Sequence, residues 1–221
     1  MNWVWPLATS LLALVFALLL LRQFLERRRI HQLVWAWAFW LFFFAAFAEF
    51  YSEVWGWNTS LYKGYYVAAA ALVAYLGAGT VYLILGRGVG HLFTLVVTAL
   101  SLLMLSRALG ANVMVNAFVP GKVVAGQAMA PEVRVLSPLL TIPGSLALLG
   151  GALYSWARGR AVHNLFIAAG TIIIAGAGGA ARFGMPSLLY GSEMVGLFLL
   201  FHGFLKSRET LRSLPRRASM K

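Results

Sequence analysis

Seven apolar stretches, most of them about twenty residues long, constrain this sequence more than any other feature. A helix that crosses a bilayer needs about 20 mostly apolar residues, because the hydrocarbon is about 30 Å thick and a helix rises about 1.5 Å per residue. The stretches are continuous rather than alternating, which favours helices over the strands of a barrel. They cover residues 3–21, 33–51, 65–85, 92–105, 136–156, 162–181 and 186–205.

The sequence therefore predicts an all-α, polytopic membrane protein. We expect a seven-transmembrane-helix bundle in residues 1–205, with a longer loop at 110–135 and a basic tail at 206–221. Composition agrees, because 61% of the 221 residues are hydrophobic and 11% are charged, whereas a soluble domain has about 25% charged residues. Cysteine and aspartate are both absent, which excludes disulfides, thiolate metal sites and any catalytic motif that needs Asp.

The basic residues gather on one side of the predicted bundle. If the N-terminus lies outside, the inner loops and the tail hold 13 of the 18 Lys and Arg residues. The positive-inside rule then predicts a cytoplasmic C-terminus in a multi-pass protein, which we assign to the plasma membrane. The basic inner face would contact anionic lipid headgroups, and the net charge of +12 needs no nucleic-acid partner.

A faint internal similarity is consistent with a parallel 3+1+3 repeat. Similar basic strings, 29–33 and 160–165, lie at the starts of the second and sixth stretches, and similar Ser-Leu and Tyr motifs occur at 60–64 and 187–191. Such a repeat resembles the layout of the SWEET sugar exporters, although the Pro-Gln pair of that family is missing here. The seven helices equally resemble rhodopsin-like proteins, but the last stretch has no lysine at its middle. Duplication and coincidence both remain open.

Ionisable residues near the outer ends of the predicted helices mark the candidate site. A charged side chain inside a membrane is costly, so it normally faces the bundle interior and has a partner. Glu49 and Glu53 are four residues apart and share a helix face, where their like charges call for a nearby cation. Tyrosines surround them in the sequence. The candidate ligand-binding residues are Glu49, Glu53, Tyr62, Lys63, Tyr66, Arg107, Arg182, Tyr190 and Glu193.

Two interpretations of this set stay open. In the first, the charges and phenols line an outward-facing cavity that binds a small polar or amphiphilic solute. In the second, Glu49 with Lys63 and Glu193 with Arg182 are ion pairs that join neighbouring helices. The 110–135 loop contains β-branched segments separated by Pro and Gly, which predicts a small hairpin or cap that acts as a lid or a tether.

The remaining motifs give no enzyme or cofactor site. The glycine-rich segment 86–90 is expected to form an inner turn, because the strand–loop–helix setting of a phosphate loop is missing. Asn58-Thr59-Ser60 matches a glycosylation sequon very close to the membrane. No metal or haem site is expected from the four histidines, which lack close ligand spacing. They are His31, His91, His163 and His202.

Three functions are consistent with these patterns. The leading hypothesis is a transporter that binds a small solute. The second is a sensory or assembly subunit whose basic inner face docks a cytoplasmic or membrane protein partner, or anionic lipid. The third is a membrane-embedded lipid-modifying enzyme that would use Glu193, His202 and tyrosines.

Overall fold

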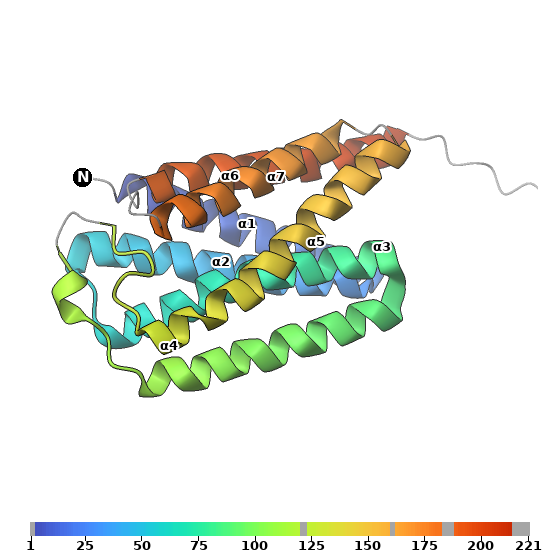
Figure 1. Ribbon diagram of the computed structural model, residues 1–221. Coiled ribbons are helices and arrows are strands. Elements are labelled where there is room, and N and C mark those ends of the chain that lie inside the picture. Colours follow the sequence, from blue (N-terminus) through green and yellow to red (C-terminus); the bar gives the residue numbers. More distant parts are fainter. Residues whose placement is uncertain (1–2, 120–122, 160–161, 183–187, 214–221) are drawn as a thin grey trace, which may run out of the picture.

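The computed structural model describes residues 3–119, 123–159, 162–182 and 188–213, without the side chains of 177–182 and 207–213. This part of the chain is helical and contains no strand, so the all-α prediction is confirmed for it. Figure 1 shows long helices aligned side by side, with one of them, α5, crossing the others obliquely. The elements are α1 (Val4–Arg27), α2 (Ile30–Trp55), α3 (Thr59–Gly110), η1 (Val115–Ala117), α4 (Pro131–Arg134), α5 (Leu136–Gly159), α6 (His163–Arg182) and α7 (Leu189–Ser213).

The long helix α3 folds back on itself at Gly86. Its 52 residues would extend about 78 Å if straight, more than twice the thickness of a bilayer's hydrocarbon. Gly86 has φ 85° and ψ −176°, which a side chain would strain, and this break divides α3 into legs of residues 59–85 and 87–110. The expected turn at glycines 86–90 is therefore present. The predicted 65–85 and 92–105 stretches lie in the two legs of this one element (Figure 1).

Hydrogen bonds join the two legs of α3 along their length. Tyr75 Oη lies 3.0 Å from Thr98 Oγ1, and Tyr82 Oη lies 2.8 Å from His91 Nδ1. At the far end Lys63 Nζ donates to the carbonyl oxygen of Leu109 over 2.7 Å. Polar side chains in apolar helices therefore hold the antiparallel pair in register.

The helices extend beyond the predicted apolar stretches because their ends are capped. Arg28 takes a left-handed conformation (φ 52°) and its N–H bonds to the Phe24 carbonyl, which ends α1. Gly56, with φ 85°, ends α2. The Asn58 side chain accepts a 2.8 Å hydrogen bond from the Leu61 N–H and starts α3, so this sequon residue has a local structural role.

Small residues bring the helix backbones together in the middle of the bundle. A Cβ added to Gly144 of α5 would lie 2.5 Å from the Val73 carbonyl oxygen, and one added to Gly77 of α3 would lie 2.5 Å from the Gly144 oxygen. Such close crossings are typical of membrane helices, which pack through small residues. On the other side, the ring of Phe16 stacks on that of Phe39, with centroids 4.0 Å apart, and joins α1 to α2.

Apolar side chains also cover the outside of the bundle. On the second leg of α3, Leu92 is 64% exposed and Leu95 is 67% exposed. A soluble protein rarely exposes so large an apolar surface. Among the described residues, four helical segments are long and apolar enough to cross a membrane. They are α1, α2, α3 and the segment Pro131–Arg158, and they indicate a membrane protein.

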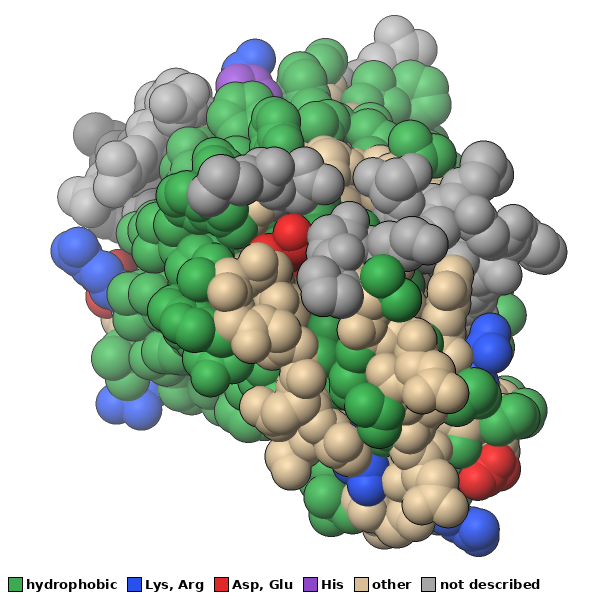
Figure 2. All heavy atoms as spheres, turned by 90° about the vertical axis from the view of Figure 1, so that its left-hand side faces the viewer, with side chains coloured by type: hydrophobic (Ala, Val, Ile, Leu, Met, Phe, Trp, Pro, Cys, Tyr) green, Lys and Arg blue, Asp and Glu red, His purple; other side chains and the backbone are tan. Residues whose placement is uncertain are grey.

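The two ends of the bundle differ in their balance of charge, because basic residues gather at one end and acidic and basic side chains are mixed at the other (Figure 2). The end that contains the α1–α2 turn, here named the Arg28 end, also carries Arg87 and the last turn of α5 with Arg158. The opposite end, here named the Gly56 end, contains the α2–α3 turn and the connection 111–130 (Figure 1). Figure 2 looks onto the Gly56 end, where an acidic side chain is visible near the middle of the face.

Candidate functional site

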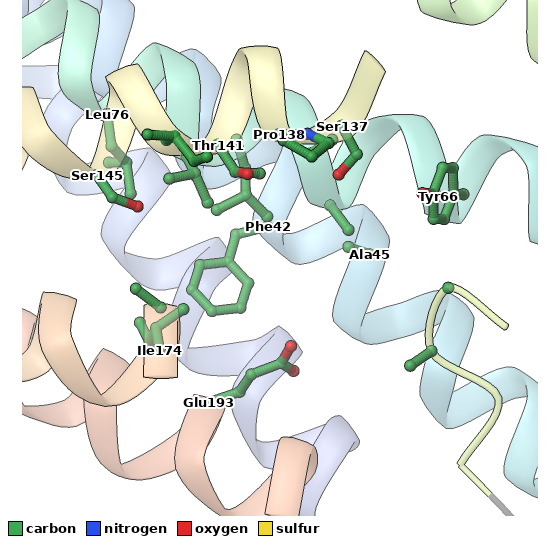
Figure 3. A pocket seen from close by; sticks show the side chains of 18 of the residues that line it. Phe42, Ala45, Tyr66, Leu76, Ser137, Pro138, Thr141, Ser145, Ile174 and Glu193 are labelled. Carbon is green, nitrogen blue, oxygen red and sulfur yellow. The ribbon is translucent and has the colours of Figure 1, made fainter. Parts of the chain in front are cut away.

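A cavity of about 660 Å³ lies among α2, α3, α5, α6 and α7. Helices α5 and α6 meet at the Arg28 end and diverge toward the Gly56 end (Figure 1), because α5 crosses α3 obliquely at the Gly77–Gly144 contact. Phe42 of α2, Thr141 of α5, Ile174 of α6 and Glu193 of α7 border the space that this divergence leaves (Figure 3). Its volume falls in the range of about 300–1,000 Å³ that is typical of small-molecule sites.

The α5 wall of the cavity carries a row of hydroxyl groups. Ser137, Thr141 and Ser145 follow at intervals of four residues, so they share one face of α5, and all three line the cavity (Figure 3). Most other lining residues are apolar. This row was missed in the sequence analysis, although the spacing of small polar residues on an apolar helix could have indicated it.

Three glutamates, here named the acidic cluster, lie near one another at this end of the bundle: Glu193 lines the cavity, and Glu49 and Glu53 lie behind it. Glu193 is partly exposed, because the cavity reaches its carboxyl group, whereas Glu49 behind it is 1% exposed. Tyr190 Oη donates to Glu53 Oε1 over 3.2 Å. The structure thus places Glu49, Glu53, Tyr190 and Glu193 near one another.

Glu49 is buried among groups that do not satisfy it. The Glu193 carboxyl and the Tyr65 hydroxyl lie beside its own carboxyl group. Among the described residues, however, neither carboxylate oxygen of Glu49 has a hydrogen-bond partner of good geometry. A buried polar group without a partner is destabilising, more so when it is ionised. This orphaned carboxyl is therefore the most unusual feature of the site.

Tyr62 and Tyr66 have different surroundings from those predicted. Tyr62 is fully buried, and its hydroxyl donates to the Ala125 carbonyl over 2.7 Å and accepts from the Ala128 N–H over 3.2 Å. It thus holds the connection 111–130 against α3 and does not line the cavity. Tyr66 does line it, next to Gly126.

Of the predicted basic residues, Lys63 and Arg107 do not neutralise the acidic cluster. The ion pair proposed between Glu49 and Lys63 does not form, because Lys63 instead binds the Leu109 carbonyl. Arg107 is exposed on the second leg of α3. Arg182 ends α6, but its side chain lies outside the described residues. The basic residue that does line the cavity is Arg134, which is exposed at the rim.

The connection 111–130 forms part of the cavity wall. Ala125, Gly126 and Gln127 line the cavity, while Ala128 and Met129 are fully buried against the bundle. Of the expected hairpin or cap, the hairpin is not formed by the described residues of this connection, which contain the short helix η1 and turns and no strand. Instead of strand pairing, hydrogen bonds of the Tyr62 hydroxyl to the Ala125 carbonyl and the Ala128 N–H hold this connection in place.

No protein-family model, curated protein or solved structure matches this chain. The functional argument therefore rests on the residues of the cavity.

Proposed function

We propose that this chain is a multi-pass protein of the plasma membrane that binds a small amphiphilic solute in the cavity and carries it across the bilayer. The orphaned carboxyl of Glu49, beside the cavity-lining Glu193, is the observation on which this proposal rests. Ionisable groups inside membrane helices are rare and mark substrate or ion pathways. The hydroxyl row of α5 and the apolar walls suit a solute with both polar and apolar parts.

The proposed orientation places the N-terminus and the Gly56 end outside and the Arg28 end in the cytoplasm. The basic residues at the Arg28 end support it, since positive residues are retained on the cytoplasmic side. In this proposal the chain crosses the bilayer seven times, with the two legs of α3 as separate crossings. Because the sequence has no cysteine, single variants Ser60→Cys and Arg158→Cys allow a clean test. An impermeant maleimide added to intact cells should label the first and not the second.

The binding proposal is tested by native mass spectrometry of the purified chain. We expect a co-purified small molecule that is lost from Thr141→Trp, in which an indole enters the cavity. The matched control is Gly150→Trp, on the same helix at an exposed position with no atom within 4 Å of an added Cβ. If Thr141→Trp keeps the same bound molecule as the control, the solute lies elsewhere and the proposal is wrong.

Transport is then measured with the identified molecule in proteoliposomes. Uptake by the wild-type chain, absent from Thr141→Trp and present in Gly150→Trp, would support a transporter. Binding without uptake would favour the sensory or assembly role, in which the basic Arg28 end docks a cytoplasmic partner. A stoichiometric protein that co-purifies and is released by charge-reversing variants at Arg87 and Arg158 would identify that role.

A further inference from the structure

The charges around the cavity are unbalanced in one direction. Among the described residues that line it, Glu193 and Arg134 are charged. Glu193 lies inside the cavity (Figure 3), whereas Arg134 is exposed at the rim. Behind Glu193 lie two more carboxyl groups, Glu49 and Glu53. The interior of the cavity is therefore acidic, and the structure gives this acidity no described basic partner.

The surroundings of Glu49 indicate which kind of ligand would fit beside it. Its carboxyl is 1% exposed, has no hydrogen-bond partner of good geometry among the described residues and lies beside the carboxyl group of Glu193. A positively charged donor placed at Glu193 would reduce the repulsion between the two carboxyl groups. An alkylammonium has three N–H donors and no acceptor, so it can bond more than one carboxylate at once.

Tyrosine rings also line the cavity, and one of them, Tyr65, lies beside the acidic cluster. Tyr65 is buried beside Glu49, and Tyr65 and Tyr66 both line the cavity. The faces of tyrosine rings attract organic cations, which adds to the carboxylate interaction. An anion would be repelled by these ring faces and by the carboxylates of the acidic cluster.

The rest of the cavity selects against a bare metal ion. The described residues include no set of three His or acidic side chains arranged to hold a metal. Hard cations such as Ca²⁺ need about six to eight oxygen ligands. Most of the 660 Å³ is bordered instead by apolar side chains, among them Phe42, Leu72 and Leu148. An apolar body of the ligand would fill this space and remove it from water.

We propose that the cavity binds a monovalent organic cation, whose ammonium group binds the cavity-lining carboxyl group of Glu193, with Glu49 behind it, and whose apolar body packs along α3 and α5. This inference rests on the proposed binding function and names its ligand class. Ile142 and Leu146 line the cavity and are 56% and 64% exposed, so the α5 side is open where a bilayer would lie. An amphiphilic amine can therefore enter from the membrane as well as from water.

The test uses three probes of one shape and different charge: 4-phenylbutylamine, 4-phenylbutanol and 4-phenylbutyrate. Binding is measured by isothermal titration of the chain in nanodiscs, with empty nanodiscs as the reference for lipid partitioning. We expect the amine to bind at least about tenfold more tightly than the alcohol, the typical effect of a charge-assisted hydrogen bond. The carboxylate should show no saturable binding.

Variants locate the charge preference. Glu193→Gln and Glu49→Gln should each weaken amine binding about tenfold or more and so remove most of the preference for the amine over the alcohol. The matched control is Glu132→Gln, an exposed carboxylate of α4 outside the cavity, which should not alter it. Arg134→Gln should tighten amine binding, because it removes a like charge from the rim. Thermal unfolding of each variant checks that it is folded.

Two results would overturn the inference. If the alcohol or the carboxylate binds the wild-type chain as tightly as the amine, the acidic cluster does not select charge. That result leaves the proposed function intact, because a solute still occupies the cavity. If amine binding survives both Gln variants while Thr141→Trp abolishes it, the cavity binds the probe without these carboxyl groups, and the ammonium position is wrong. Failure of the proposed function itself would instead be seen as equal binding by Thr141→Trp and Gly150→Trp.

Discussion

Replacing Tyr62 by Phe should destabilise the protein only through the loss of two hydrogen bonds. The Tyr62 hydroxyl is fully buried, donates to the Ala125 carbonyl over 2.7 Å and accepts from the Ala128 N–H over 3.2 Å. Phe keeps the ring and its packing against Trp57 and Phe118, so no large cavity forms. The variant leaves a buried carbonyl and a buried N–H without their partner.

The expected loss is about 2–3 kcal/mol, since an unsatisfied buried group costs about 1–3 kcal/mol and relaxation recovers part of two such losses. For a chain of this size that corresponds to a fall in Tm of roughly 4–12 °C. Tyr75→Phe is the matched control, because it removes one hydroxyl that bonds a single side chain, Thr98, at a half-buried position. It should cost about 1 kcal/mol or less.

Thermal unfolding in detergent compares the two variants, and hydrogen exchange gives a local readout. The Ala128 amide should exchange faster in Tyr62→Phe than in the wild type and stay protected in Tyr75→Phe. Equal Tm values for the two variants, with unchanged Ala128 exchange, would refute the role of Tyr62 as the side chain that holds the connection 111–130.

Three further predictions concern the helices and the acidic cluster. Gly144→Ala should lower stability by about 1–3 kcal/mol, because the new Cβ would press on the backbone of α3. Gly150→Ala, which has open space around the new Cβ, should not lower stability. Similar unfolding curves for the two variants would contradict the close crossing of α3 and α5. Asn58→Ala should cost about 1 kcal/mol by removing the cap of α3, and Asn58→Asp, which also accepts the Leu61 N–H, should largely restore stability in the same assay. Glu49→Gln should raise or preserve the Tm of the ligand-free chain while it weakens amine binding. Binding sites commonly trade stability for function in this way. A marked fall in Tm would show that Glu49 is a structural residue.

The candidate site was only partly predictable. Glu49, Glu53, Glu193 and Tyr190 could be proposed from sequence, because an ionisable or polar-tipped group in an apolar helix must face the interior. The side-chain partners could not be. Lys63 was one candidate partner for Glu49, yet it binds a carbonyl on the other leg of α3. That contact depends on how the chain reverses at Gly86. The hydroxyl groups of Ser137, Thr141 and Ser145 could not be assigned to a site from the sequence, because only the tertiary structure shows that α5 borders a cavity.

The sequence by itself determined that the chain is helical and where its helices run, since a backbone in lipid must satisfy its hydrogen bonds within each apolar segment. The sequence also determined which loops are basic, because the positions of Lys and Arg can be read from it directly. Only the tertiary structure decided that Tyr62 holds a connection instead of lining the site, and that α5 leaves a cavity beside the acidic cluster. These features arise from the angle at which α5 crosses α3 and from contacts between residues far apart in the chain, which no local pattern encodes.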